Sequence, residues 1–392
     1  MARRVLYLMP NAVPGGAERA TMLMLGAHDR QRYEPGVLFF SDGPLVDAAR
    51  RLGLDVSVLD KPLHLRHPWS IHRAVATASA LVRSGEYHLA HSCMAYAHLI
   101  GGAVGWRCGV PVVLYQHGPL GLWMDGAATL LRCDRILVNS TYTAGGQRAQ
   151  SWRSRPITMA PYGIDVKCPT DREREAWQAL IDARHGIPTN APVVGIMARF
   201  DPWKGIDVAL QAMAPLLRSN PDRRFLVVGG PYRHFHPGYG EALVALAERE
   251  GVRNQVVFAG FQMDVRPYLA RMTVLVHASV QAEPFGLTII EAMASGVPVV
   301  AARAGGTVEI IDEGVDGLFH TPGNQTELRD ALHTLLSDAT LRDRYVRAGL
   351  RKVESRYRPA SMMRVIEGVY DELLGVGATA SNRDSQPVVR AS

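Results

Sequence analysis

Residues 274–301 read VLVHASVQAEPFGLTIIEAMASGVPVVA, and this stretch decides the fold. The run at 274–277 is β-branched and leucine-rich, as in a buried strand, and a similar run follows at 298–301. Between the two runs, Pro284 and Gly286 break the chain ahead of a short helical pattern. Two buried strands joined through a helix form a parallel βαβ unit, which is the building block of a doubly wound sheet.

The same alternation of short apolar runs with helical patterns extends along nearly the whole chain. In the first half we expect strands at 5–9, 36–40, 56–59, 111–115 and 135–138, with helices at 16–27, 44–51 and 71–84. A second series of strands is expected at 193–199, 225–228, 255–259, 274–277 and 298–301. The sequence therefore predicts an α/β protein of two doubly wound, Rossmann-like domains that face a central cleft.

The domain boundaries follow from these two series. We expect an N-terminal domain over 1–170 and a C-terminal domain over 190–358. The interdomain linker is placed around 166–190, where the strand pattern lapses into a charged helical stretch and a segment rich in Gly and Pro. A last helical pattern covers 359–374, and the polar residues 376–392 are expected to be a disordered tail.

Composition and charge exclude several classes of protein. The chain has 392 residues, long enough for two domains, and a formal net charge of +6. Residues 1–190 carry 21 Lys and Arg against 15 Asp and Glu, so the whole excess lies in the first half. No basic run or basic-aromatic interleaving indicates binding of nucleic acid. The four cysteines lack the spacing of a zinc site, and no apolar segment is long enough for a secretory signal or a membrane span. We therefore expect a cytoplasmic protein.

The segment from Glu283 to Glu291 carries the strongest functional signal. It follows the strand at 274–277, at the edge where open α/β sheets bind ligands. The backbone N–H groups of Gly286, Leu287 and Thr288 would be first-turn donors for an anion. Carboxylates accept hydrogen bonds from hydroxyl groups, and the two glutamates would meet different parts of one ligand. Taken alone, Glu283 could be a solvated loop residue and Glu291 an acid favoured by the helix dipole. Together with the surrounding motif, the two glutamates predict a ligand with a diphosphate between two polyols.

A second signal is the segment ARFDPWKG at 198–205, where a strand ends and a helix begins. Arg199 and Lys204 bracket the loop, and Lys204 is one of only four lysines in the chain. Two cations over a diphosphate stabilise the charge that develops on a departing nucleotide, as a divalent metal does elsewhere. The ordinary alternative is a pair of surface cations.

Two further candidates lie in the first half. Gly15 and Gly16 join the first strand to the first helix, where a glycine permits close approach of a ligand to a helix N-terminus, although a simple tight turn explains the pair as well. His117 follows the strand at 111–115, at the cleft edge of its domain. The motif at Gly15 lacks the GxGxxG spacing and the ribose acid of nicotinamide-dependent enzymes.

Taken together, these motifs resemble a known family. The segment from Glu283 to Glu291, the Arg199-x4-Lys204-Gly spacing, the Gly-Gly-Ala-Glu at 15–18 and the Tyr-Gly-Ile-Asp at 162–165 are similar to those of the retaining, nucleotide-sugar-dependent glycosyltransferases of family 4, which have the GT-B fold. The resemblance extends from the N-terminus to about residue 374. The chain departs from the family pattern at three places. The family often has His-Asp where this sequence has His117-Gly118, Gly where it has Ala198, and Asn where it has Tyr162.

The resemblance implies a role for each matching residue. Glu291 would bind the ribose of the donor nucleotide and Glu283 the hydroxyls of the transferred sugar, while His117 would lie near the reacting sugar. The catalytic set would be His117, Arg199, Lys204 and Glu283. The donor-binding set would be Gly16, Arg199, Lys204, Phe261, Gln262, Glu283, Phe285, Gly286, Leu287, Thr288 and Glu291. No metal or other cofactor is implied, and the helix at 359–374 would pack back on the first domain.

The expected reaction is transfer of a glycosyl unit from a nucleotide diphosphate sugar to an acceptor hydroxyl, with retention of configuration. UDP-sugars and GDP-mannose are both candidate donors. The acceptor is left open between a lipid-linked saccharide, a polysaccharide or lipopolysaccharide intermediate and a small natural product. Alternatives are a non-catalytic sugar-nucleotide-binding protein, a nicotinamide-dependent oxidoreductase, and an epimerase or glycogen-synthase-like enzyme on the same fold. The basic first half predicts an anionic acceptor, or peripheral contact with an anionic membrane face.

Overall fold

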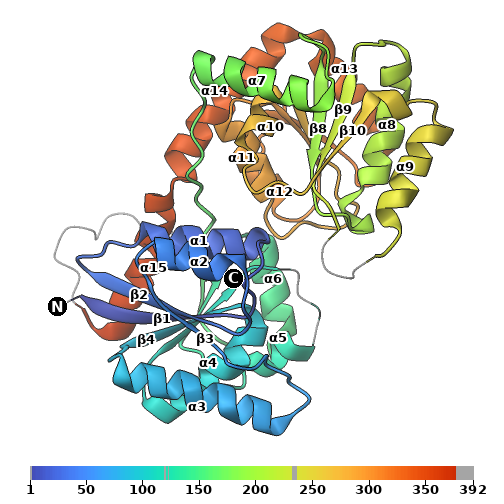
Figure 1. Cartoon of the computed structure of the whole chain (residues 1–392). Helices are drawn as coiled ribbons and strands as arrows, with labels where there is room; N and C mark the ends of the chain where they lie inside the picture. Colours follow the sequence, from blue (N-terminus) through green and yellow to red (C-terminus); the bar gives the residue numbers. More distant parts are fainter. Residues whose placement is uncertain (1, 119–120, 122, 232–235, 377–392) are drawn as a thin grey trace. The chain divides into compact units, whose positions relative to one another are not determined.

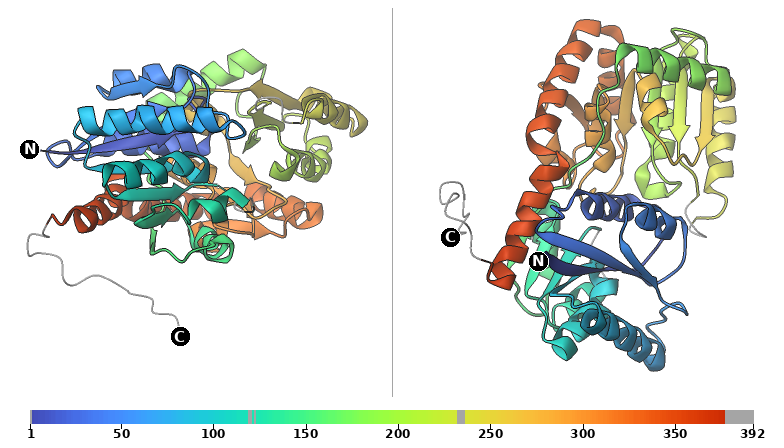
Figure 2. Two further views of the ribbon diagram at one scale, coloured as in Figure 1. Left: turned by 90° about the horizontal axis from the view of Figure 1, so that it is seen from below. Right: turned by 60° about the vertical axis from the view of Figure 1, so that its left-hand side comes forward.

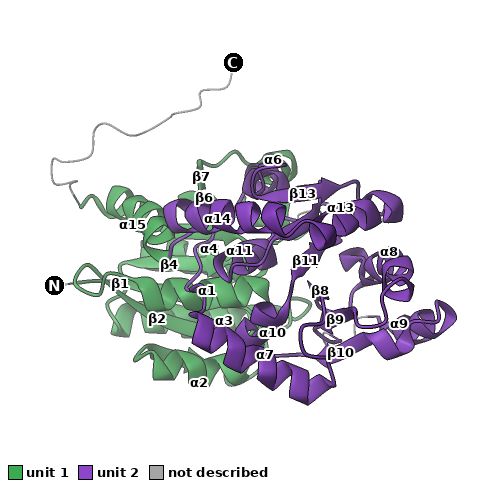
Figure 3. Cartoon of the chain, turned by 90° about the horizontal axis from the view of Figure 1, so that it is seen from above, with its two compact units in different colours: residues 1–138, 144–161, 359–392 green, residues 139–143, 162–358 purple. Residues whose placement is uncertain are grey.

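The computed structural model describes residues 2–118, 121, 123–231 and 236–376 (Figure 1). The chain divides into two compact units. Unit 1 comprises residues 1–138, 144–161 and 359–392, and unit 2 comprises residues 139–143 and 162–358 (Figure 3). Each unit is built around its own parallel sheet, so the predicted pair of doubly wound α/β domains is confirmed at the level of fold class.

Unit 1 contains a sheet of seven parallel strands in the order β3-β2-β1-β4-β5-β6-β7. The strands are β1 (Arg3–Met9), β2 (Tyr33–Phe39), β3 (Asp55–Val58), β4 (Leu89–Cys93), β5 (Val112–Gln116), β6 (Arg135–Val138) and β7 (Ile157–Met159). The helices are α1 (Gly16–Ala27), α2 (Pro44–Arg51), α3 (Pro68–Ser84), α4 (Met94–Cys108), α5 (Trp123–Ala128), α6 (Thr141–Gln150), which begins in unit 2, and α15 (Pro359–Leu374). All residues of β4 and β5 and the last five residues of β1 are buried, as expected of strands covered on both faces.

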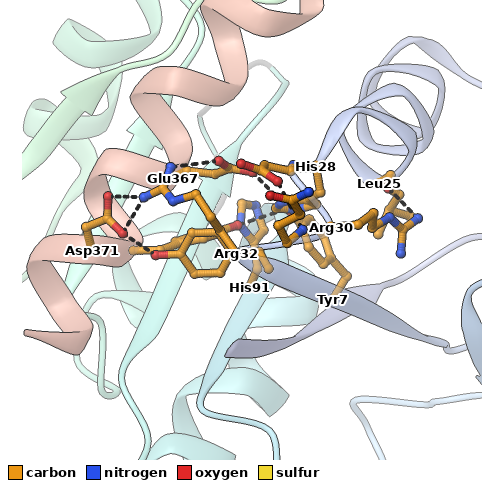
Figure 4. Close-up of polar contacts among 12 residues, drawn as sticks. Tyr7, Leu25, His28, Arg30, Arg32, His91, Glu367 and Asp371 are labelled. Atoms are coloured by element: carbon orange, nitrogen blue, oxygen red, sulfur yellow. Dashed lines mark hydrogen bonds and ion pairs between the residues drawn. The ribbon is translucent and has the colours of Figure 1, made fainter. Parts of the chain in front are cut away.

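Helix α15 comes from the end of the described chain and packs against α1 in unit 1 (Figure 2). A buried polar network holds it there (Figure 4). The Tyr370 hydroxyl lies 2.9 Å from that of Tyr7 and 2.5 Å from Nδ1 of His91. His28 Nδ1 lies 2.9 Å from a carboxylate oxygen of Glu367. Because these groups come from α15, from the sheet and from the end of α1, the last helix is fixed by specific hydrogen bonds as well as by apolar contact.

Unit 2 contains a sheet of six parallel strands in the order β10-β9-β8-β11-β12-β13. The strands are β8 (Val193–Met197), β9 (Arg224–Val228), β10 (Val256–Gly260), β11 (Val274–His277), β12 (Val299–Ala302) and β13 (Gly317–His320). The helices are α7 (Asp171–His185), η1 (Pro202–Lys204), α8 (Ile206–Arg218), α9 (Tyr239–Arg249), η2 (Arg253–Gln255), α10 (Arg266–Arg271), α11 (Leu287–Ala294), α12 (Thr307–Ile310), α13 (Gln325–Ser337) and α14 (Ala339–Arg356). Apolar side chains of β8, β9 and β11 pack with those of α8 and α13 to form the core.

The segment expected to be an interdomain linker is largely helix α7, and α7 belongs to unit 2. Its Asp182 forms an ion pair with the buried Arg271 of α10, and its Gln178 donates a hydrogen bond to the carbonyl of Ala270. A capping box at Thr170 and Glu173 starts the helix. The charged surface of α7 suggested a linker, but these contacts attach it to α10 of unit 2.

Three strands and several helices escaped the sequence analysis. β4 reads LAHSC and β13 reads GLFH, and their polar residues mask the apolar pattern of a strand, while β7 has only three residues. Helix α4 contains three glycines, which lower helix propensity. The helix expected at 359–374 coincides with α15. The expectation for the tail concerns 377–392, which lie outside the described residues, and only its first residue, Val376, is described.

Within the described part of the chain, no helix is long and apolar enough to span a membrane.

Four buried histidines of unit 1 predict acid sensitivity. Burial lowers the pKa of His28 and of His91, and lowers that of His98 and His117 to about 3. Such a group stays neutral in the folded state and binds a proton on unfolding. The free energy of unfolding should therefore decrease as the pH falls below about 6.5, by up to about 1.4 kcal/mol per pH unit for each histidine. The decrease for His98 and His117 should continue to about pH 3.

The measurement is urea unfolding of the wild type and of His98→Leu between about pH 7 and pH 5. The His98→Leu variant should lose less stability on acidification than the wild type. His72→Gln replaces an exposed histidine of α3 and should keep the wild-type pH dependence. Equal pH dependence in all three proteins would contradict the assignment of His98 as neutral and buried.

Candidate active site

Two loops meet at the carboxyl edge of the sheet of unit 2. One follows β8 and carries Arg199 and Lys204, and the other follows β11 and carries Glu283. The two strands are direct neighbours, paired through Val274 and Val194. Parallel strands end at one edge, so side chains far apart in the sequence come together there.

Close backbone contact holds the two loops against each other. Gly205 has a φ of +64°, and a Cβ built on it would lie 2.1 Å from the carbonyl oxygen of Ala278. The N–H of Val280 donates to the carbonyl of Trp203 at 2.8 Å. Only glycine fits at position 205, both for its left-handed backbone and for its distance from the β11 loop.

Lys204 and Glu283 form the central ion pair of the site. The Lys204 Nζ lies 2.6 Å from Oε2 of Glu283, and only 19% and 14% of the two side chains are exposed. Burial by itself would raise the pKa of Glu283. The charge of Lys204 and a hydrogen bond with His277 outweigh that effect and hold the pKa of Glu283 well below its ordinary value. Glu283 is therefore an ionised carboxylate at any physiological pH.

The backbone of Glu283 is fixed as firmly as its side chain. Its carbonyl accepts a hydrogen bond of 2.7 Å from the N–H of Gly306, and its own N–H donates to the carbonyl of Ala304 at 3.4 Å. Gly305 has a φ of +74°, and a Cβ there would lie 2.2 Å from the Glu283 carbonyl oxygen. The loop that follows β12 thus clamps the start of the Glu283 motif.

Arg199 and Lys204 share an aromatic neighbour that the sequence analysis did not single out. The Lys204 Nζ lies 3.9 Å from the ring centroid of Trp203, and the guanidinium carbon of Arg199 lies 5.7 Å from it. Arg199 Nε also lies 3.3 Å from a carboxylate oxygen of Asp201. The loop therefore gathers two cations around one indole ring, a favourable arrangement for both charges. A tryptophan beside a lysine in a strand-end loop was the only hint of this in the sequence.

The N-terminus of α11 lies in the same motif. Gly286, with a φ of +116°, caps the helix, and no side chain accepts a hydrogen bond at this cap. Leu287 and Thr288 begin the helix, so their N–H groups are oriented as the anion donors that the sequence predicted. Glu291 lies one turn further on and is buried.

Phe285 and the segment after β10 complete the predicted donor set. The Phe285 side chain is buried and packs edge-to-face on Tyr162, with ring centroids 4.9 Å apart. A contact of Phe285 with a ligand would therefore have to come from its backbone. Phe261 is 58% exposed, and Gln262 donates to the carbonyl of Ala259 at 2.7 Å. Among the described residues, no hydrogen bond or ion pair joins Phe261 or Gln262 to the Lys204–Glu283 pair.

The two remaining candidates belong to unit 1. His117 follows β5, is buried, and stacks on Tyr115 with ring centroids 4.1 Å apart. Its Nε2 lies 3.5 Å from the hydroxyl of Thr21 in α1, a neighbour that the sequence did not suggest. Burial lowers the pKa of His117 to about 3, so its imidazole is neutral at physiological pH. Gly16 begins α1, and a Cβ there would meet no atom within 4 Å.

Across the described residues, no group of His, Cys, Asp and Glu is arranged to hold a metal ion.

Comparison with known proteins assigns the family. The model described as Glycosyltransferase Family 4 matches residues 14–167, and that described as Glycosyl transferases group 1 matches residues 178–352. A D-inositol 3-phosphate glycosyltransferase of Acidothermus cellulolyticus is 30% identical over 82% of this chain and 75% of its own length. The chain belongs to glycosyltransferase family 4. A relative of the same name from Nocardia farcinica is 33% identical over 69% of this family 4 chain, and the match spans 62% of the relative.

Solved structures confirm the GT-B fold. The structure of HepE from Anabaena in complex with UDP-glucose has a TM-score of 0.82, 25% identity, and coverage of 94% of this chain and 99% of the other. Sucrose-phosphate synthase from Thermosynechococcus elongatus has a TM-score of 0.78 at 19% identity, over 96% and 100% of the two chains. The two parallel sheets described above are those of this fold.

Replacing Gly305 by alanine should damage the site through its backbone. A residue other than glycine with a left-handed φ costs about 1–2 kcal/mol, and the Cβ would also displace the Glu283 carbonyl. Gly314 is a matched control, because it has the same φ of +74° with no atom within 4 Å of a built Cβ. Thermal melting should show a clearly larger loss for Gly305→Ala than for Gly314→Ala. Equal losses would contradict the close packing of the loop after β12 on Glu283.

Proposed function

We propose that this family 4 chain is a retaining glycosyltransferase that moves a sugar from a nucleotide diphosphate sugar to an acceptor hydroxyl. The observation that carries the proposal is the partly buried Lys204–Glu283 pair, beside Arg199 and in the same motif as the N-terminus of α11. This arrangement offers cations and amide donors for a diphosphate and a carboxylate for hydroxyl groups. The family and the fold support it.

The roles of the donor-binding residues follow from their chemistry. Arg199 and Lys204 hold the diphosphate, assisted by the amides of Gly286, Leu287 and Thr288. Glu283 accepts hydrogen bonds from hydroxyls of the transferred sugar, and Glu291 from those of the ribose. These roles require that the carboxyl groups are ionised. For Glu283, the lowered pKa meets this requirement.

For the residues after β10 and for those of unit 1, we propose the roles that the family resemblance implies. The base rests on the segment of Phe261 and Gln262. Gly16 permits close approach to the N-terminus of α1. His117 contacts the reacting sugar as a neutral hydrogen-bonding group, because its lowered pKa leaves it without charge.

The reaction proceeds on one face of the sugar. The bond from the anomeric carbon to the diphosphate oxygen breaks, and the acceptor oxygen bonds to the same face of that carbon. The acceptor hydroxyl passes its proton to the departing diphosphate oxygen. Glu283 is a poor nucleophile for a covalent intermediate because Lys204 offsets the negative charge of its carboxylate. Arg199 and Lys204 offset the charge on the leaving group, so the proposal requires no divalent metal.

Similar proteins suggest which substrates to test first. The neighbouring structure of HepE contains UDP-glucose, which supports a UDP-sugar as the first donor to test ahead of GDP-mannose. The curated relatives are named as D-inositol 3-phosphate glycosyltransferases, which supports a phosphorylated polyol among the acceptors. Lipid-linked saccharides should be tested as acceptors alongside it.

The charge of unit 1 supports an anionic partner. Unit 1 carries 20 Lys and Arg against 14 Asp and Glu, whereas unit 2 carries 23 of each. Residues 61–73 contain Lys61, Arg66 and Arg73 with no acidic residue, and Trp69 in this segment is 68% exposed. We propose that unit 1 binds an anionic acceptor, or contacts an anionic membrane face from the cytoplasm.

Substitution of the central pair tests the site directly. Lys204→Ala and Glu283→Ala should each lower kcat/KM for transfer by about 10²–10³-fold, because each removes a charged contact to the reacting groups. Lys167→Ala removes an exposed lysine of the same unit and should retain wild-type turnover. Near-normal turnover in both Lys204→Ala and Glu283→Ala would contradict the assignment of these residues to the active site.

Sedimentation with liposomes tests the membrane version of the proposal. At low salt the chain should co-sediment with vesicles that contain anionic lipid and less with neutral vesicles, and salt should release it. Arg66→Glu in unit 1 should weaken the binding, while Arg347→Glu, an exposed control in unit 2, should not. Equal sedimentation with both kinds of vesicle would exclude the membrane version and leave the anionic acceptor.

A further inference from the structure

Three donors converge on a single oxygen of Glu283. Lys204 Nζ lies 2.6 Å from Oε2, the hydroxyl of Ser279 donates to it at 3.1 Å, and Nε2 of His277 lies 3.2 Å away. All hydrogen bonds that the described residues make to this carboxylate end on Oε2. The second oxygen, Oε1, is therefore the one with capacity to accept a hydrogen bond from a ligand.

Among the described residues, the hydrogen-bond contacts of the His277 ring are with Glu283 and Ser279. His277 is the last residue of β11, and its side chain is 6% exposed. Its Nε2 faces the carboxylate of Glu283, which can only accept, so this nitrogen carries the proton. Its Nδ1 is buried and has no hydrogen-bond partner among the described residues. An unpaired buried polar atom is costly, so a histidine kept only for packing is a poor explanation here.

The backbone around His277 and Ser279 is rigid. The carbonyl of Ala278 lies against Gly205, and the carbonyl of His277 faces Nε2 of His320 at 3.4 Å. Ser279 is buried, and its oxygen lies 3.3 Å from Nε2 of His277. The histidine and the serine therefore reach Oε2 from fixed positions, and the carboxylate has little freedom to rotate.

We propose that His277 and Ser279 are positioning residues that lock the Glu283 carboxylate through Oε2 and thereby aim Oε1 at a hydroxyl of the transferred sugar. This proposal rests on the proposed function, because it needs a sugar in front of Glu283. Lys204 offsets the carboxylate charge, and the hydrogen bonds from His277 and Ser279 set the orientation of the carboxylate. Loss of orientation at a reacting group typically costs up to about 10²-fold in rate.

The part of the donor affinity that the sugar contributes distinguishes a positioning role of His277 and Ser279 from a purely structural role. His277→Ala and Ser279→Ala should retain the affinity for the nucleoside diphosphate, which rests on other groups. Both should lose most of the extra affinity of the nucleotide sugar over the diphosphate, and kcat should fall by about 10–100-fold. A variant with a disrupted fold would lose both affinities together. His277→Gln can place an amide N–H near the former Nε2 and should recover part of kcat.

The experiment measures calorimetric affinities for UDP and UDP-glucose, and kcat for hydrolysis or transfer, in the wild type and each variant. His333→Ala, an exposed histidine of the same unit, is the control and should behave as wild type. The proposal is overturned if His277→Ala and Ser279→Ala keep the wild-type ratio of affinities and kcat, or if His277→Gln is no better than His277→Ala. A wild type that binds neither compound nor GDP and its sugars overturns the proposed function itself.

Discussion

The ion pair between Lys204 and Glu283 joins the two loops on which the site depends. It connects the end of β8 to the end of β11, and both partners are largely shielded from solvent. Charges in such surroundings are costly to leave unpaired, so each one constrains the other. The same carboxylate is held at its backbone by the loop after β12 and at Oε2 by His277 and Ser279. Three strand ends thus contribute to the placement of one functional group.

The two units contribute different kinds of chemistry. Unit 2 presents paired charges that keep Glu283 ionised, and the formal net charge of this unit is zero. Unit 1 buries neutral histidines, including His117, and carries the whole net positive charge of the protein. A polar network joins α15 to the sheet and to the end of α1 in unit 1, and it includes two of these histidines, His28 and His91. Diphosphate recognition is therefore proposed for unit 2, and recognition of an anionic partner for unit 1.

Much of this was predictable from the sequence because it depends on local patterns. The alternation of apolar runs located most strands, and the motif from Glu283 to Glu291 indicated the ligand edge. The roles of Trp203 and His277 could not be predicted, since each depends on how its own loop folds to bring it against a nearby charged side chain. Strand β4 was missed because its buried His and Ser resemble surface residues in a sequence, although tertiary contacts cover them. Phe285 had been grouped with ligand-binding residues, but its side chain lies in the core, a distinction that only packing reveals.

The most direct test of the central claim, that unit 2 recognises a diphosphate at Arg199 and Lys204, is a calorimetric comparison of nucleoside diphosphates with the matching monophosphates. The account predicts that at least one diphosphate, with UDP tested first, binds at least about tenfold more tightly than its monophosphate, because the second phosphate adds charge-assisted hydrogen bonds. It also predicts that this advantage disappears in Lys204→Ala. Equal affinity for monophosphate and diphosphate, or an undiminished advantage in Lys204→Ala, would contradict the account.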